Sequence, residues 1–223
     1  SRINVTTFEN NNEIGVFAVD ASKVSSIELK SSNYADNVCY RYNGSSFAAV
    51  NASEAITISD DNSKGLAYFA VYPYISNTGP TTSFTVKSNQ QSHANYSLSD
   101  LCTSYQAPTT SQQVDLIFNH RLCNVIVELQ GDNIASKSIT MKTTNVQRTV
   151  QMNLNANTFV AQGNKGDILM NSGPYTNAYQ CIIAPQEVEK GTKIFVATIA
   201  GKETSLTFTS NASFKSGCQY TYK

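Results

Sequence analysis

The chain has 223 residues, enough for one large domain or for two small domains that each bury a core. Its 16 basic and 16 acidic residues cancel, charged residues make up 14% of the chain, and no basic block occurs. This charge balance argues against nucleic acid and anionic membranes as partners, and no apolar run reaches the length of a membrane span.

The residue composition favours strands over long helices. Ser, Thr and Asn together supply about a third of the residues, and Lys and Glu are few, which suits strands joined by turns. Disorder would need low hydrophobicity together with a high net charge, and neither occurs. No signal peptide is visible, so we expect either a cytosolic protein or a processed form of an exported one.

The first half of the chain predicts a series of short strands. Residues 13–19 are an apolar run too short to favour a helix, and residues 38–42 and 46–50 predict a hairpin across Asn43-Gly44, a two-residue turn signal. Pro73 cannot donate to a strand ladder, so the strand at 66–74 should leave its sheet there or run along an edge. Further strand candidates are 3–8, 55–58 and 82–86; residues 21–35 fit a helical turn or a loop, and 98–102 fit a helical turn capped by Ser97 or Ser99.

Two strand-like halves meet at the middle of the chain. In residues 114–119, Val114, Leu116 and Phe118 share one face at the two-residue period of a half-buried strand. In residues 123–129 the odd-numbered side chains, apolar in four cases, share a face in the same way. The polar, proline-bearing run 105–113 comes directly before, where a two-domain chain would have its boundary.

The second half predicts strands at 138–142, 146–154, 158–161, 178–183, 192–200, 202–209 and 218–222. Roughly fifteen short strands with frequent turn signals and no helix-period segment are typical of β-sandwiches. A single domain seldom uses so many strands, so we predict an N-terminal sandwich over residues 1–110 and a C-terminal sandwich over residues 114–223.

Five widely spaced cysteines show no CxxC or Cys/His metal spacing. They are Cys39, Cys102, Cys123, Cys181 and Cys218. We interpret them chiefly as small buried hydrophobes, with one or two disulfides left open. A catalytic thiol would have only His93 or His120 as its base.

The residues with side-chain chemistry favour structural roles. His120 continues the row of Val114, Leu116 and Phe118, so we expect a hydrogen-bonded histidine in the core or at the domain interface; His93 lies in a polar run without a nearby carboxylate in the sequence. Asp60, Asp61 and Asn62 carry calcium-binding oxygens, but their spacing matches no ligand loop and indicates a solvated turn.

No nucleophile elbow, phosphate loop or zinc-binding helix signature occurs, so we expect no enzyme, no cofactor and no metal site. The sparse carboxylates define no glycosidase pair without geometry. Some tyrosines have two open interpretations, stacking on sugars or a host protein, or packing on strand faces. These are Tyr34, Tyr72, Tyr74, Tyr105 and Tyr175.

Six segments, in order, carry a family resemblance over residues 13–222. They are 13–18 (EIGVFA), 37–42 (NVCYRY), 67–74 (AYFAVYPY), Asp100-Leu101 with 116–122 (LIFNHRL), 182–186 (IIAPQ) and 214–222 (FKSGCQYTY). Together they resemble the fimbrillin family, the FimA-like and Mfa-like subunits of protease-matured fimbriae in Bacteroidia.

The resemblance implies an all-β fold of two tandem transthyretin-like, Greek-key β-sandwich domains. It implies a lipoprotein precursor exported through the outer membrane to the cell surface, where an arginine- or lysine-specific protease removes the N-terminal strand. The open groove would accept a strand from the next subunit, because a sandwich lacking a strand exposes unpaired backbone and an apolar trough. Ile14, Val16, Phe17 and Val19 would belong to the groove-lining strand.

The ends of the sequence suggest two finer expectations. Arg2 is a candidate processing position, the alternative being an incidental arginine in a truncated chain. The last predicted strand ends at Tyr222, whereas stalk subunits of the family carry a further donor appendage. A fimbrial tip is therefore favoured slightly over a stalk, and truncation would explain the same observation.

The sequence thus predicts a non-enzymatic structural subunit of a surface fimbria that supports adhesion or biofilm formation. Its partners would be other fimbrial subunits through strand exchange, with a host or bacterial surface protein or glycan as a further partner. The alternative is a free-standing glycan- or protein-binding module on the same fold. A third interpretation, a hydrolase, would need a convergent pair of carboxylates or a histidine site in a cleft.

Overall fold

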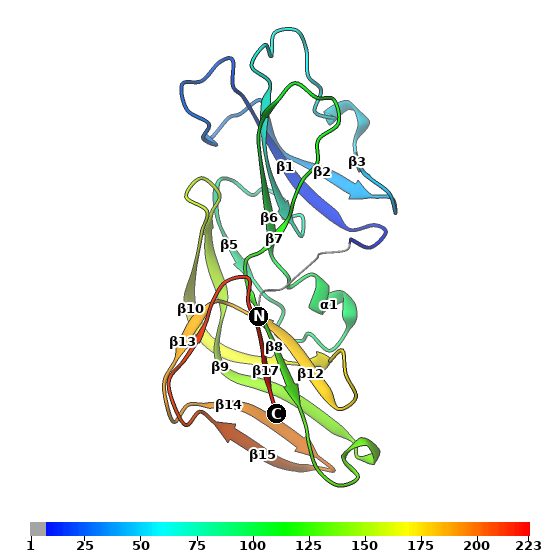
Figure 1. Cartoon of the computed structure of the whole chain (residues 1–223), viewed down its shortest axis with the longest axis vertical. Coiled ribbons are helices and arrows are strands. Elements are labelled where there is room, and N and C mark those ends of the chain that lie inside the picture. Colours follow the sequence, from blue (N-terminus) through cyan, green and yellow to red (C-terminus); the bar gives the residue numbers. More distant parts are fainter. Residues whose placement is uncertain (1–7) are drawn as a thin grey trace.

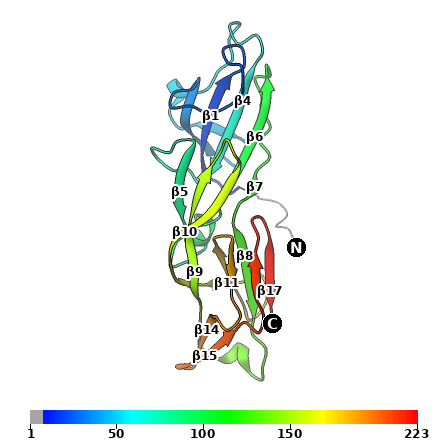
Figure 2. The same ribbon diagram turned by 90° about the vertical axis from the view of Figure 1, so that its left-hand side faces the viewer.

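Residues 8–223 are described in a computed structural model, and strands make up nearly all of their regular structure (Figures 1 and 2). The described helices are α1 (His93–Ser97) and the 3₁₀ turns η1 (Ala52–Glu54) and η2 (Ile134–Ser136). In the described part of the chain, no helix has the length and hydropathy needed to cross a membrane. The all-β class predicted from the sequence is confirmed.

Six antiparallel strands form the upper sheet of Figure 1, in the order β3-β2-β1-β4-β6-β7. Their bounds are β1 Glu13–Asp20, β2 Ala35–Tyr42, β3 Phe47–Ala49, β4 Leu66–Tyr72, β6 Cys102–Thr109 and β7 Asn119–His120. The strands β1 and β4 lie at the centre, and every residue of β4 is buried, so this pair has to be covered on both faces.

Three further sheets build the lower half of the molecule. The largest has the order β10-β9-β14-β15, with β5 paired to the far half of β9; a second has the order β11-β12-β8-β17, and β13 pairs with β16. Their bounds are β5 Thr81–Thr85, β8 Cys123–Glu128, β9 Ile139–Asn153, β10 Thr158–Leu169, β11 Asn171–Ser172, β12 Ala178–Ile183, β13 Gln186–Val188, β14 Lys193–Ile199, β15 Lys202–Thr207, β16 Ala212–Phe214 and β17 Gln219–Tyr222. The edge strand β15 has every side chain exposed, including Lys202 and Glu203.

Strand pairing crosses the predicted domain boundary twice. β5 precedes residue 110, yet it pairs with β9, from Thr81 opposite Asn153 to Thr85 opposite Thr149. β7 follows residue 114, yet it pairs with β6. The division into domains at 1–110 and 114–223, and their tandem transthyretin-like topology, stay predictions.

The buried apolar residues form two clusters on opposite faces of the upper sheet. The main core runs from Phe17 and Phe69 of the upper sheet into β5, β8, β9, β12 and β14, for example Val125 and Met152. The upper cluster lies on the other face and includes Ile14. Its other fully buried members are Val16, Ala18, Leu66, Tyr68, Ala70, Tyr72 and Cys102. Burial of each large side chain stabilises the fold by about 1.5–3 kcal/mol before the entropy of ordering is subtracted.

Two amide side chains, those of Asn155 and Gln90, join segments far apart in the sequence. The Asn155 side chain, between β9 and β10, accepts from Leu29 N at 2.8 Å and donates to Leu29 O at 2.9 Å. Gln90 is fully buried and does the same for Ile182 of β12, where its Nε2 donates to the carbonyl at 2.9 Å and its Oε1 accepts from the backbone N–H at 2.8 Å. Each amide thus pairs with both the N–H and the C=O of one residue, as a neighbouring strand does in a sheet.

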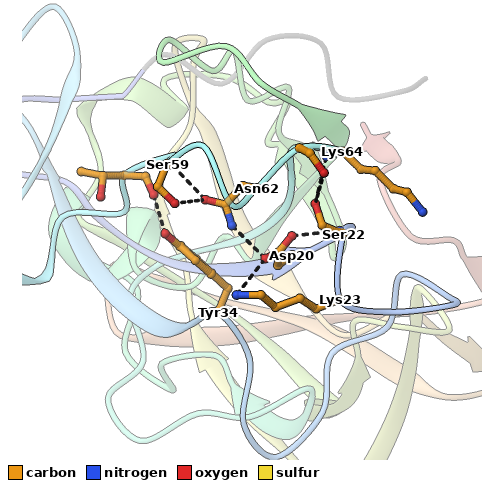
Figure 3. Close-up of polar contacts among 9 residues, drawn as sticks. Asp20, Ser22, Lys23, Tyr34, Ser59, Asn62 and Lys64 are labelled. Carbon is orange, nitrogen blue, oxygen red and sulfur yellow. Dashed lines mark hydrogen bonds and ion pairs between the residues drawn. The ribbon is translucent and has the colours of Figure 1, made fainter.

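The buried carboxylate of Asp20 links the end of β1 to the turn that precedes β4 through hydrogen bonds (Figure 3). Asp20, 5% exposed, accepts from Ser22 N at 2.9 Å and from Asn62 Nδ2 at 2.8 Å, with Lys23 Nζ at 3.5 Å. Burial acts to raise the pKa of Asp20, but these hydrogen bonds outweigh it, and the pKa lies below its ordinary value. Asn62 is buried in this network, so the interpretation of the whole 60–62 turn as solvated was wrong at that residue.

Several predicted elements differ from the structure. Residues 55–58 and 114–118 form no strand, the helical turn occupies 93–97 with Ser92 as its N-cap, and the β2–β3 hairpin has a four-residue loop because Tyr42 pairs with Phe47. The two strands expected at 138–142 and 146–154 are one strand, β9. The strand before Pro73 ends at Tyr72, as predicted. Residues 3–7 of the first strand candidate lie outside the described residues.

No disulfide joins any two of the five cysteines, all of which lie in the described part of the chain. Cys102, Cys123 and Cys181 are fully buried, as the interpretation as small hydrophobes predicted, while Cys39 and Cys218 are partly exposed. Burial raises the pKa of the Cys123 and Cys181 thiols far above the ordinary value, so neither is a thiolate at neutral pH.

Replacing Asp20 with Asn should destabilise the fold at neutral pH by about 1–2 kcal/mol, because hydrogen bonds to a charged group are lost. A carboxyl whose folded pKa is lowered stabilises the fold above its unfolded pKa, and that stabilisation is lost as pH falls through the folded pKa. The free energy of unfolding, measured by urea titration, should therefore fall less steeply in the variant than in the wild type as the pH is lowered below about 5. The exposed Asp61→Asn variant is the matched control; a D61N curve that flattens as much as that of D20N would contradict this account.

Gln90→Ala should lower the free energy of unfolding by about 1–3 kcal/mol, because the Ile182 peptide group is left buried without its partner. Gln91→Ala, at the exposed neighbouring position, should change it by less than about 0.5 kcal/mol. Equal losses of stability in the two variants, measured by denaturant titration, would show that the Gln90 bonds do not matter.

Candidate functional site

A groove with a volume of about 660 Å³ opens on the upper-cluster face of the upper sheet. Ile14 and Val16 of β1 and Tyr68 of β4 supply apolar surface from the sheet itself. The remaining lining residues are Tyr40, Tyr42, Ser45, Ser46, Phe47, Ile56, Gln112, Gln113, Val114, Asp115, Leu116 and Phe118. We call this feature the groove.

Among residues 8–223, no second sheet covers this face of the upper sheet, and the groove lies on it. The other face packs on the main core, while this one is covered by partly buried side chains from segments without assigned strands, among them Phe8, Ile56 and Ile58. A sandwich needs two layers of strands to bury both inner faces and to pair their backbones. Within residues 8–223 the second layer contains no paired strands.

Residues 114–118 form the longest of these covering segments. Figure 1 shows the green connection between β6 and β7 descending along the upper sheet. Val114, Leu116 and Phe118 are partly buried on the upper cluster, while Ile117 is 77% exposed. The alternation read from the sequence is therefore confirmed, but the predicted strand is wrong, because within the described residues this segment has no strand partner.

The upper sheet also keeps an open edge beside this segment. β6 pairs with β4 along its length but with β7 only at Cys102 and Thr103. From Ser104 onward the outer edge of β6 has no paired strand among the described residues. Backbone groups that lack partners next to an apolar groove are a template for an added strand.

An aromatic cluster closes the lower end of the upper-cluster face. The Phe8 ring contacts Phe47, Phe118 and Tyr72 edge to face, with ring centroids 4.9, 5.0 and 5.4 Å apart. Such edge-to-face contacts add about 0.5–1.5 kcal/mol each to the burial of the rings. Phe8 thus fixes the start of the described chain across the face that the groove occupies.

The predicted groove residues are divided between the two faces of β1. Ile14 and Val16 line the groove, whereas Phe17 and Val19 point the other way into the main core. The apolar run did not reveal this division, because β1 is buried on both sides. Arg2, the candidate processing residue, lies outside the described residues. Reasoning from sequence missed Tyr40 and Phe47 as lining residues, although their strand positions were available as a signal.

The groove offers apolar and hydrogen-bonding surface and no array of reactive groups. Tyr40 Oη accepts from Ile56 N at 2.8 Å, and Gln112 Nε2 donates to Ile58 O at 3.3 Å. Burial raises the pKa of Tyr68, so its hydroxyl stays protonated at neutral pH. This surface suits recognition of an extended peptide.

The two histidines and the candidate sugar-stacking tyrosines do not line the groove. His93 Nε2 lies 2.7 Å from Glu9 Oε1, a carboxylate that its sequence neighbourhood did not indicate, and His120 contacts Asp100, as expected of a hydrogen-bonded histidine. Tyr105 and Tyr175 are 53% and 60% exposed. Of the other sugar-stacking candidates, Tyr72 is buried, Tyr74 is partly buried and Tyr34 donates to Thr57 O.

Several solved structures of proteins from Bacteroides share the fold of this chain. A candidate cell adhesion protein from Bacteroides uniformis is 17% identical with a TM-score of 0.70, over 96% of this chain and 87% of that one. Another from Bacteroides ovatus has the same identity and TM-score, over 96% and 82%. A fimbrial protein from Bacteroides ovatus is 19% identical with a TM-score of 0.60, over 97% of this chain and 44% of that one.

At the level of sequence, a search of curated proteins finds no match. The family model described as fimbrillin-like, in contrast, matches residues 1–223, the whole chain. The match agrees with the resemblance carried by the six segments. The chain therefore belongs to the fimbrillin-like family.

Proposed function

We propose that this chain is a non-enzymatic structural subunit of a cell-surface fimbria, and that its groove accepts a β-strand from a neighbouring subunit. The observation that carries the proposal is the groove of about 660 Å³, with Ile14 and Val16 in its lining and the strandless segment 114–118 along it. Membership of the fimbrillin-like family and the fold shared with a fimbrial protein support it.

Strand addition would supply paired strands over the face of the upper sheet that no second sheet covers among residues 8–223. An incoming strand would place alternate apolar side chains against the groove-lining residues and would satisfy backbone groups of β6 or of residues 114–118. Backbone hydrogen bonds do not depend on the side chains of the added strand. The same kind of groove could therefore join each subunit of a polymer to the next. No side-chain chemistry is required.

Proteolytic maturation follows from the same proposal. In a precursor, a segment of the subunit itself would cover the groove and block assembly, and its removal would expose the apolar surface. Arg2 stays the predicted cleavage position, and the route through a lipoprotein precursor and the position at a fimbrial tip stay predictions. Adhesion and biofilm formation would be the output of the assembled fibre.

Filling the groove should prevent assembly without unfolding the subunit. Ser46 is exposed and lines the groove, so Ser46→Trp should place a bulky side chain there. In a bacterium that assembles the protein and lacks the wild-type copy, we expect at least about a tenfold loss of polymerised subunit, measured as detergent-resistant ladders from the cell surface.

Ser205→Trp on β15 is the matched control, since Ser205 is equally exposed and lies outside the groove. It should polymerise as the wild type does, and both variants should keep the wild-type melting temperature. Normal ladders from a folded Ser46→Trp protein would refute the groove as the strand acceptor.

A further inference from the structure

Three side chains of types that can bind metal ions lie close together where β6 pairs with β7. His120 Nδ1 lies 2.8 and 2.9 Å from the two carboxylate oxygens of Asp100 and 3.4 Å from the sulfur of Cys102. One donor atom from each side chain falls within 4.8 Å of the others. No other group of this kind occurs among residues 8–223.

The β-ladder itself holds the three donors together. Cys102 and His120 are directly opposite each other in the antiparallel β6–β7 pair, so their side chains share a face. Asp100 precedes Cys102 by two residues and therefore lies on the same side in extended backbone. Arg121 N also donates to Leu101 O at 2.8 Å, which extends the pairing to the residue before the start of β6.

We propose that Asp100, Cys102 and His120 bind a zinc ion, with the fourth coordination position left to water or another ligand. Thiolate, imidazole and carboxylate are the three ligand types that zinc takes in proteins. A tetrahedral ion with bonds of about 2.0–2.3 Å holds its donor atoms roughly 3.3–3.7 Å apart. The distances from His120 Nδ1 to Asp100 and to Cys102 are slightly shorter than or within this range, so small shifts would bring these pairs to the spacing of ligands around one ion.

The charges in the site suit a buried dication. Ion binding releases the thiol proton to solvent and uses the neutral imidazole with Nδ1 unprotonated, so thiolate and carboxylate together cancel the two positive charges. Cys102 is fully buried and the His120 side chain is 8% exposed, while the Asp100 side chain is 20% exposed and gives the ion an entry.

Nearby groups modulate the affinity. The Arg121 side chain, next to His120, donates from Nε to Thr103 Oγ1 at 2.6 Å and lies over the Phe159 ring. Its positive charge opposes the ion but favours the Cys102 thiolate. Tyr72, opposite Cys102 on β4, has its hydroxyl 2.8 Å from Ser97 Oγ and stays neutral because burial raises its pKa.

A bound ion would strengthen the link between the two halves of the molecule. β7 belongs to the upper sheet, and two residues later the chain enters β8 in the lower sheets. An ion that binds only the folded chain raises its stability by mass action, so zinc should raise the melting temperature and a chelator should reverse the shift.

The test is to titrate the chelator-treated full chain with Co²⁺ as a spectroscopic probe and with Zn²⁺ as a competitor. We expect one equivalent of Co²⁺ to give a thiolate-to-cobalt charge-transfer band that Zn²⁺ displaces. Cys102→Ser should abolish the band, and Asp100→Asn should weaken Zn²⁺ binding, measured by calorimetry, at least about tenfold.

Cys39→Ser is the control, because Cys39 is a partly exposed thiol outside the three-residue group, and it should keep the band. A wild-type chain without a charge-transfer band overturns the proposal, whatever the folding of the variants. A band that survives Cys102→Ser, or that disappears in Cys39→Ser, also overturns it, because the thiolate ligand would then lie elsewhere.

Discussion

The fold depends on the central pair β1 and β4, whose side chains are apolar on both faces. A strand buried on both sides cannot stay at the surface of a sandwich, so each face of the upper sheet needs a cover. The main core supplies one cover through β5, β9 and their neighbours. The other is assembled from connecting segments, and the groove is the part that these segments leave open.

Much of the fold could be predicted from the two-residue period. Strands β1, β4, β5, β8, β12 and β14 were predicted to within a few residues, because alternating or continuous apolar runs bounded by turn residues leave few other solutions. The same period failed at residues 114–118. There the pattern correctly gave which side chains face inward, but a strand also needs a partner with free backbone groups, and periodicity carries no information about the partner.

The groove and the group Asp100, Cys102 and His120 also depend on contacts that local sequence patterns cannot predict. Val16 and Phe17 are neighbours in one apolar run, yet they line different clusters, and only the arrangement of the sheets decides which of them meets the groove. Asp100 and His120 are twenty residues apart and meet because β6 and β7 pair in one register. The side-chain amides of Gln90 and Asn155 likewise bond to residues 92 and 126 positions away. Such contacts follow from topology, and local patterns cannot reveal them.

The fully exposed edge strand β15 has a consequence for any fibre built from this subunit. Lys202 and Glu203 keep this edge hydrated, and apart from Leu206 its side chains are polar, so an approaching strand would find little apolar surface to bury. The described chain therefore presents an exposed, charged sheet border at β15 and a different border at β6, beside the groove to which we assign strand acceptance. If strands add at the groove as proposed, this difference between the borders would give the fibre a direction, with a head and a tail, and would disfavour side-by-side aggregation through β15.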